Sequence, residues 1–135
     1  MSREEDVQEW MTYAERDRRA ARHLLESGDY EACALHCQQA VEKLLKAGIV
    51  SQTGERPPYE HNLWKLAQAI DGLTIPDEMA DKLASLNPHY FGSRYPIGID
   101  MGYDEALARE LLAKVDEVFL WLTKVLNLPT DSTAI

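Results

Sequence analysis

The stretch from Tyr30 to Ala47, YEACALHCQQAVEKLLKA, decides how this chain folds. Read at 3.6 residues per turn, one face of the predicted helix carries small and apolar residues: Cys33, Cys37, Ala40, Leu44 and Gly48. Small side chains let a neighbouring backbone approach closely. We therefore expect this helix to be the most enclosed one in the molecule.

The opposite side of the same helix is polar and needs a separate explanation. It carries Leu35, Gln39, Glu42 and Lys46. Glu42 lies four residues before Lys46, which is the favourable order for an ion pair along a helix. This side is either a solvated surface or a binding surface.

The segment before this helix predicts a long helix over residues 4–26, with a bundle seam of Val7, Trp10, Ala14, Asp17, Ala21 and Leu24. Asp17 interrupts the apolar seam. A buried charge must be paired or used, so Asp17 is either paired with an Arg or Lys of another helix or is a functional carboxylate. Gly28 and Asp29 then form a tight turn in which Asp29 can cap the next helix.

Four arginines lie close together in the first helix of an acidic chain: Arg16, Arg18, Arg19 and Arg22. They form either a solvated helix surface or a phosphate-binding patch. The sequence pattern does not separate these two interpretations.

The remaining segments also predict helices and no strands. A short helix is expected from about His61 to Ile70, another from Pro76 to Asn87, and a closing helix over 104–126. The loop over 89–102 is unusually aromatic for a connection, so it either covers the core or lines a site. The pattern predicts an all-α, mostly antiparallel up-and-down bundle, with one domain over 1–128 and a flexible tail over 129–135.

Composition excludes several classes of protein. The chain has 135 residues, 45% of them hydrophobic, as in an ordinary globular domain. A net charge of -9 argues against binding nucleic acid by bulk charge. No apolar run approaches the ~20 residues that span a bilayer, and MSREED is no signal peptide, so we expect a cytoplasmic protein. No metal or cofactor is expected, because Cys33 and Cys37 have only His36 nearby.

The central helix and the segments around it resemble the HEPN domain family. The family shows a Gly-x-Tyr turn followed by Gln-Gln-Ala-x-Glu-Lys-x-Leu-Lys-Ala, which matches Gly28 to Tyr30 and Gln38 to Ala47 here. His61-Asn62-Leu63 resembles its His-x-Leu after a proline. Tyr90 with Arg94-Tyr95-Pro96 resembles its Tyr…Arg-Tyr-Pro loop. The resemblance covers roughly Tyr13 to Leu126.

This resemblance implies a five-helix bundle, often a homodimer, in a commonly prokaryotic family. Such proteins are often encoded beside a minimal nucleotidyltransferase, as a pair that resembles a toxin–antitoxin system. Some members are metal-independent ribonucleases whose signature is Arg, four to six residues, then His on a late helix.

The present chain departs from that ribonuclease signature. Its closing helix contains Arg109 but no histidine. Two arginines of the first helix, Arg16 and Arg18, have this spacing to His23, but they are not on a late helix. Arg56 has it to His61, but two prolines lie between them. If the protein cleaves RNA, His61 and Arg94 are the candidate catalytic pair, since the reaction needs a proton-transfer group and a cation.

Two functions of different class follow. The first is a binding module for a nucleotide, RNA or a nucleotidyltransferase partner, with a pocket formed by Gln39, Glu42, Lys43, Lys46, His61, Tyr90, Arg94 and Tyr95. Arg94 would hold phosphate and an aromatic ring would stack on the base. The alternative is a metal-independent ribonuclease toxin with a non-standard site.

Overall fold

The computed structural model describes residues 2–89 and 102–130, in which every regular element is an α-helix. The helices are α1 (Arg3–Ser27), α2 (Tyr30–Thr53), α3 (Leu63–Gln68), α4 (Asp77–Leu86) and α6 (Glu105–Leu126). The prediction of an all-α bundle is confirmed. The predicted limits of the first and closing helices differ from those of α1 and α6 by at most one residue, and α2 continues beyond the quoted stretch to Thr53.

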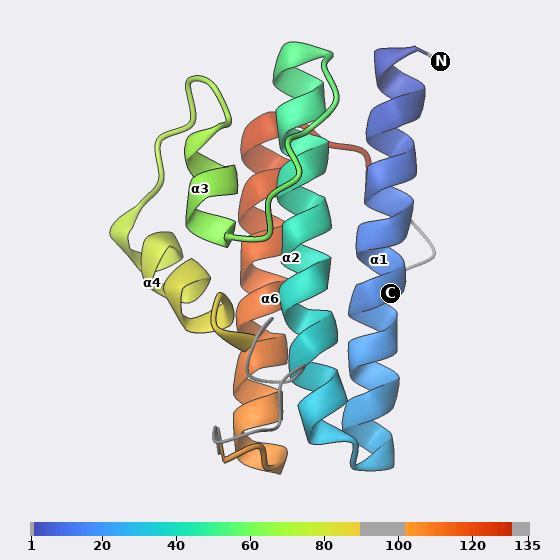
Figure 1. The fold of residues 1–135 in the computed structure, drawn as a ribbon, viewed down its shortest axis with the longest axis vertical. Helices are drawn as coiled ribbons and strands as arrows, with labels where there is room; N and C mark the ends of the chain where they lie inside the picture. The colour runs from blue at the N-terminus through green and yellow to red at the C-terminus, as the bar shows by residue number, and fades with distance from the viewer. Residues whose placement is uncertain (1, 90–101, 131–135) are drawn as a thin grey trace.

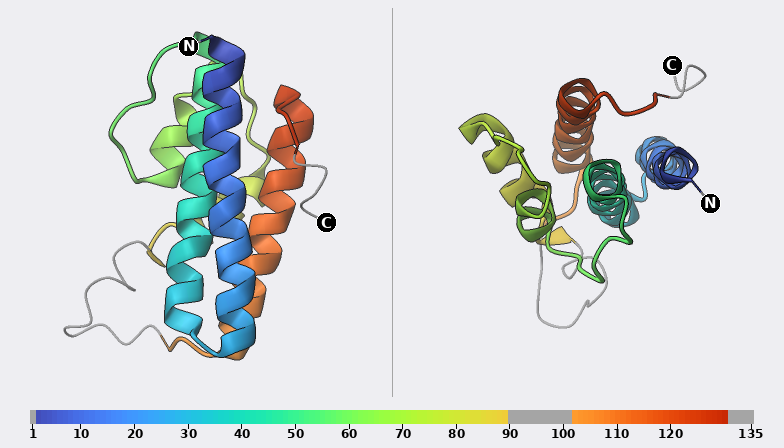
Figure 2. Two further views of the ribbon diagram at one scale, coloured as in Figure 1. Left: turned by 90° about the vertical axis from the view of Figure 1, so that its right-hand side faces the viewer. Right: turned by 90° about the horizontal axis from the view of Figure 1, so that it is seen from above.

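Helix α2 is the centre of the bundle. It packs against α1, α6, α3 and α4. Figure 1 shows the three long helices side by side, with α3 and α4 beside α2 and α6 and away from α1. Seen from above, α1 and the α3–α4 pair lie on opposite sides of α2 (Figure 2). Helix α2 is therefore covered on several sides, and three of its polar residues, Gln38, Glu42 and Lys46, are buried.

The small-residue face of α2 explains its central position. Cys33, Cys37, Ala40 and Leu44 are completely buried. At Gly48, an added Cβ would lie 2.9 Å from Ile70 Cδ1 and 3.0 Å from Leu126 Cδ1. Both contacts are tighter than nearly all real Cβ contacts, so a larger residue would force the ends of the Ile70 and Leu126 side chains to shift, and Gly48 favours the close approach of α6 and of the segment just after α3. The prediction that this helix is enclosed is confirmed.

The turn between α1 and α2 makes the two helices antiparallel. Gly28 has a φ of 84°, in the left-handed region where glycine is favoured. Asp29 occupies the position before α2, but its side chain does not cap the helix. Its carboxylate accepts a hydrogen bond from the Ser27 hydroxyl at 2.8 Å instead, so the predicted capping role is wrong.

Helix α3 is shorter than predicted. The Asn62 side chain accepts a hydrogen bond from the backbone N–H of Lys65, which makes Asn62 the N-cap and Leu63 the first helical residue. His61 therefore lies in the loop before the helix. This difference matters, because a loop residue can turn its side chain back onto α2.

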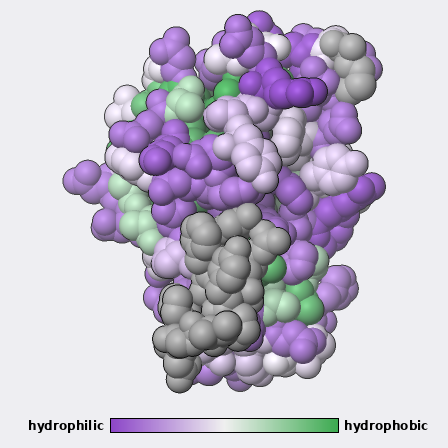
Figure 3. Space-filling view, viewed as in Figure 1, coloured by the Kyte–Doolittle hydropathy of each residue, from purple (hydrophilic) through white to green (hydrophobic). Residues whose placement is uncertain are grey.

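The face of the molecule that carries α2, α3 and α4 in front is mainly polar where it is coloured in Figure 3. In the orientation of Figure 1, hydrophilic residues dominate the coloured part of the face, with small hydrophobic areas between them (Figure 3). The most exposed apolar residues of α6 are Leu120 and Val125. The polar side of α2 predicted from the sequence is, in contrast, largely covered.

Candidate functional site

A buried carboxylate organises the polar side of α2. Glu42 Oε1 lies 3.0 Å from His61 Nδ1, and Glu42 Oε2 accepts a hydrogen bond from Lys46 Nζ at 3.1 Å. The side chains of Glu42 and Lys46 are only 9% and 8% exposed, whereas that of His61 is 30% exposed. We call Glu42, Lys46, His61 and Gln38 the Glu42 cluster. The interpretation of this side as a solvated surface is wrong for Glu42 and Lys46.

Gln38 belongs to this cluster, although the sequence analysis selected Gln39. Gln38 is completely buried and donates from Nε2 to the carbonyl oxygen of His61 at 3.0 Å and to Glu42 Oε1 at 3.4 Å. Its Oε1 is a buried polar atom that finds no donor among the described residues. Gln39 is half-buried and takes no part in the cluster. The sequence alone does not show which of Gln38 and Gln39 meets the loop, because that depends on where the His61 carbonyl lies.

The cluster ties the loop after α2 to the helix itself. Both His61 contacts cross about twenty residues of sequence, from the end of the loop to the middle of α2. The Tyr59 ring packs edge-on against the His61 ring, with centroids 5.2 Å apart. Arg56 and His61 belong to the same loop, so the contacts of His61 help to set where Arg56 lies.

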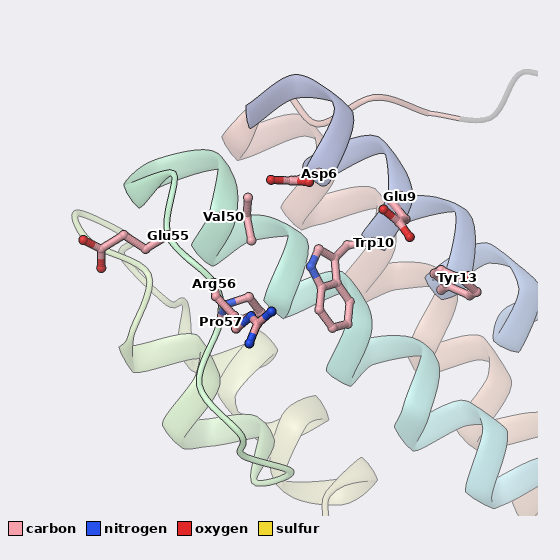
Figure 4. A pocket seen from close by; sticks show the side chains of 8 residues that line it. All are labelled: Asp6, Glu9, Trp10, Tyr13, Val50, Glu55, Arg56 and Pro57. Atoms are coloured by element: carbon pink, nitrogen blue, oxygen red, sulfur yellow. The ribbon is translucent and has the colours of Figure 1, made fainter. Parts of the chain in front are cut away.

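A cleft opens beside this cluster, between α1, the end of α2 and the loop. It has a volume of about 420 Å³ and is lined by Asp6, Glu9, Trp10, Tyr13, Val50, Glu55, Arg56 and Pro57. Figure 4 shows the Arg56 side chain directed toward the Trp10 ring, while Glu55 points away from it. We call it the Trp10 cleft. Lys46 Nζ lies 5.7 Å from the centre of the Trp10 ring, so the cleft adjoins the Glu42 cluster.

Lys43 lies in a second cluster, between α1 and α2. Its Nζ donates a hydrogen bond to Asp17 Oδ2 at 2.5 Å, and Asp17 Oδ1 lies 2.9 Å from His36 Nδ1. The side chains are 10% exposed for Asp17, 32% for His36 and 30% for Lys43. The expectation that Asp17 pairs with a cation of another helix is confirmed, and His36 is a partner that the sequence analysis missed. These three residues form the Asp17 cluster.

The arginine-rich stretch of α1 mainly contacts α6. Arg18 bonds Glu15 and Asp116, and its guanidinium lies 4.3 Å from the centre of the Phe119 ring. Arg22 bonds the same Asp116 oxygen at 2.8 Å. Neither predicted interpretation, a solvated surface or a phosphate patch, describes Arg18. Arg16 remains exposed, with its guanidinium 5.1 Å from the centre of the Tyr13 ring.

Three predicted site residues, Tyr90, Arg94 and Tyr95, lie outside the described residues. Of the other five, the structure brings Glu42, Lys46 and His61 together and places Lys43 in the neighbouring Asp17 cluster. Gln39 joins neither. Trp10 and Arg56 were not predicted as site residues, because Trp10 fits an ordinary helix seam and Arg56 lies in a loop that sequence periodicity cannot position.

One histidine differs from the others in its surroundings. His89 is buried at the end of the segment after α4, where Nδ1 lies 3.0 Å from the Tyr103 hydroxyl. Burial lowers the pKa of His89, and the positive charge of Lys114 lowers it further, while a backbone hydrogen bond at Ser85 acts in the opposite direction. Burial also raises the pKa of Tyr103 to about 12.

Comparison with known proteins decides the family. The model of the HEPN domain matches residues 7–126 of the chain. The chain belongs to the HEPN domain family. No curated protein sequence matches it.

Two solved structures share the HEPN fold over most of the chain. ST0689, described as an archaeal HEPN homologue, is 28% identical, with a TM-score of 0.72 over 89% of this chain and 97% of that one. TT1696 from Thermus thermophilus is 22% identical, with a TM-score of 0.81 over 92% of this chain and 98% of that one. At that identity, the second comparison shows the fold alone.

The ribonuclease signature of some HEPN proteins can now be compared with the geometry. Arg109 of α6 pairs with Glu105 one turn earlier, and α6 contains no histidine. Arg18, which has the family spacing to His23, is paired with the carboxylates of Glu15 and Asp116. Arg16 with His23 on α1 and Arg56 with His61 in the loop after α2 also have the family spacing, and of these residues Arg56 lines the Trp10 cleft.

The described residues give no indication of a metal centre or a membrane span. No group of three His, Cys, Asp or Glu side chains among them could hold a metal ion. None of the helices they form combines the length and the apolar character that crossing a bilayer requires.

Proposed function

We propose that this HEPN protein is a nucleotide-binding module that works with a nucleotidyltransferase partner in a two-component, toxin–antitoxin-like system. The observation that carries the proposal is the Trp10 cleft, in which Arg56 is directed toward an aromatic ring next to the buried Glu42 cluster (Figure 4). A cation and an aromatic ring side by side are the minimum needed to hold a phosphate and a base. A volume of about 420 Å³ is that of a small-ligand site.

The cleft supplies one group for each part of a nucleotide. The Trp10 ring offers a surface on which a base can stack. The Arg56 guanidinium can donate two parallel hydrogen bonds to phosphate oxygens. Asp6 and Glu9 lie on α1 at the edge of the cleft, where their carboxylates can accept hydrogen bonds from an exocyclic amino group. We therefore expect adenine, guanine or cytosine nucleotides to bind better than uracil nucleotides.

The Glu42 cluster acts on this site by positioning. Lys46 lies beside the Trp10 ring, and Glu42 fixes Lys46 on one side and His61 on the other. Since His61 closes the loop that carries Arg56, the same carboxylate helps to place both walls of the cleft. Arg94, the cation first expected to hold phosphate, is not needed for this arrangement.

Calorimetric titration with AMP, ATP and GTP tests the nucleotide proposal. Arg56→Ala should weaken binding about tenfold to a hundredfold, the loss expected for a charge-assisted hydrogen bond. The matched control is Arg109→Ala, because Arg109 is also exposed but, within the described part of the chain, forms its ion pair with Glu105 of its own helix. Absence of heat for the wild-type protein with all three nucleotides would contradict the proposal.

The nucleotidyltransferase partner is supported by family membership, because HEPN proteins are often encoded beside a minimal nucleotidyltransferase. Co-expression with the product of a neighbouring nucleotidyltransferase gene, followed by purification through a tag on one chain, tests it. Recovery of both chains in a fixed ratio supports the pair. Recovery of the tagged chain alone would contradict it.

The ribonuclease alternative is favoured by one observation, the Arg56 and His61 pair beside the cleft. His61 Nδ1 is held by Glu42, an arrangement that orients an imidazole for proton transfer. Cleavage of single-stranded RNA in EDTA by the wild-type protein, lost in both His61→Gln and Arg56→Ala, is expected if the alternative holds. Loss of cleavage in Arg94→Ala but not in Arg56→Ala would identify His61 and Arg94 as the catalytic pair.

We also propose that α6 mediates a homodimer. Leu120 and Val125 are exposed on it, and Trp121 is half-buried beside them. Light scattering at micromolar concentration should give twice the mass of the chain, and Leu120→Asp should return it to the monomer mass. A monomer mass for the wild-type protein would contradict this proposal.

A further inference from the structure

The Asp17 cluster lies outside the Trp10 cleft and has no role in the proposed function. It differs from an ordinary helix–helix ion pair because a histidine shares the carboxylate. Asp17 is nearly buried, but about a third of the His36 side chain is exposed to solvent. The cluster therefore presents an oriented imidazole at the surface where α1 and α2 meet.

The carboxylate decides which nitrogen of His36 is available. An ionised carboxylate only accepts hydrogen bonds, so Nδ1 of His36 is the nitrogen that carries the hydrogen. In the neutral imidazole, Nε2 then holds the free lone pair. Within residues 2–89 and 102–130, no hydrogen-bond partner occupies this Nε2. The arrangement is that of a nucleophilic or basic histidine with its orienting acid.

One cation, Lys43, shares the Asp17 carboxylate with this imidazole, and a second, Arg16, lies near the same Tyr13 ring as Lys43. Lys43 Nζ uses one of its three hydrogens on Asp17, and its side chain is 30% exposed. The same Nζ lies 6.0 Å from the centre of the Tyr13 ring, over which the Arg16 guanidinium also lies. Arg16 has no ion pair among the described residues. Lys43 and Arg16 thus lie near one ring and can attract an anionic group to a chain whose net charge is -9.

We propose that His36 is a phosphoryl-acceptor residue, modified at Nε2 by donors with a good leaving group such as phosphoramidate or acyl phosphates. The Nε2 lone pair forms a bond to phosphorus, and the bond from phosphorus to the leaving atom breaks with its electron pair. The hydrogen on Nδ1 stays in place, and the positive charge that develops on the ring is stabilised by Asp17. Lys43 and Arg16 neutralise the phosphoryl oxygens.

Incubation of the full chain with phosphoramidate, followed by intact mass measurement and peptide mapping, tests this proposal. The donor loses ammonia, which takes a proton from water, and the protein gains one acid-labile phosphoryl group. We expect the label on His36 alone, with nitrogen-15 NMR showing attachment at Nε2. His36→Gln should abolish labelling, whereas His23→Gln, which changes an exposed histidine of α1, should leave it intact.

A second variant tests whether Asp17 assists the reaction of His36. Asp17→Asn should slow labelling of His36 by roughly tenfold or more, because the developing charge loses its carboxylate. Absence of label on wild-type protein, or a label that mapping places on other histidines, would overturn the proposal. Phosphoramidate contains no nucleotide, so neither result depends on whether the Trp10 cleft binds one.

Discussion

The Asp17 cluster and the Glu42 cluster have the same chemistry in two different surroundings. In each cluster, a nearly buried carboxylate contacts Nδ1 of a histidine with one oxygen and Nζ of a lysine with the other. Both histidines are about one-third exposed, so the lysines make the difference: the Lys46 side chain is 8% exposed and that of Lys43 is 30% exposed. The Glu42 cluster therefore contains a buried pair of opposite charges, whereas the lysine of the Asp17 cluster is in contact with water.

This difference predicts unequal costs for removing the carboxylate. A buried charge that loses its partner remains desolvated, whereas an exposed one is hydrated by water. The Glu42 cluster is thus expected to be a structural support for the cleft. The Asp17 cluster can change its charge state or bind an anion at lower cost, which fits the role proposed for His36.

The largest expected effect is that of Glu42→Gln. It leaves the Lys46 ammonium buried without a countercharge, so we expect a loss of about 3–5 kcal/mol in the free energy of unfolding, measured by urea denaturation. The double variant Glu42→Gln with Lys46→Met removes both charges and should recover most of this loss. A single-variant loss below about 1 kcal/mol would contradict the buried pair.

Asp17→Asn should have a smaller effect on the same measurement. His36 and Lys43 keep contact with water after the change, so the loss should be about 1–2 kcal/mol, as for hydrogen bonds to a charged group. If this variant is destabilised as much as Glu42→Gln, the difference in lysine exposure does not control the energetics. The explanation of the two clusters by the exposure of their lysines would then be wrong.

Most of the fold could be predicted from the sequence because the residues that determine it act locally. Gly28 ends α1 and Pro76 lies immediately before α4, and each acts through its own backbone angles. The small residues of α2 predicted its enclosure, and the i, i+4 spacing predicted the pair of Glu42 with Lys46. These inferences need no knowledge of what lies across the helix.

The site could be read only in part because its contacts are long-range. His36 reaches Asp17 across 19 residues, and His61 reaches Glu42 across another 19. Helical periodicity gives the direction of a side chain but not the segment that it meets. Gln38 was missed for the same reason: only the loop carbonyl of His61 distinguishes it from Gln39.

His89 supplies a third histidine environment, in which the imidazole is buried and lies beside the Tyr103 hydroxyl. Because burial lowers the pKa of His89, the folded protein binds a proton there less readily than the unfolded chain. The contribution of His89 to stability is therefore present above the unfolded pKa of about 6.5 and is lost as pH falls through the lower folded value. Thermal melts between pH 7 and pH 5 should show this fall in the wild-type protein and a weaker one in His89→Gln. An equal slope in both would exclude His89 as the cause.

The smallest expected effect on stability is that of Arg56→Ala. Arg56 is exposed at the edge of the cleft and has no ion pair among the described residues, so the free energy of unfolding should change by less than about 0.5 kcal/mol. A larger change in a urea titration would show that Arg56 supports the fold. In that case a binding defect of this variant could not be assigned to a lost ligand contact.

Calorimetric titration of ATP into the wild-type protein, Arg56→Ala and Arg109→Ala is the most direct test of the central claim, that the Trp10 cleft binds a nucleotide. The account predicts binding heat for the wild-type protein and for Arg109→Ala, and binding weakened about tenfold or more in Arg56→Ala at unchanged stability. No heat with the wild-type protein, or equal affinity in all three proteins, would contradict it.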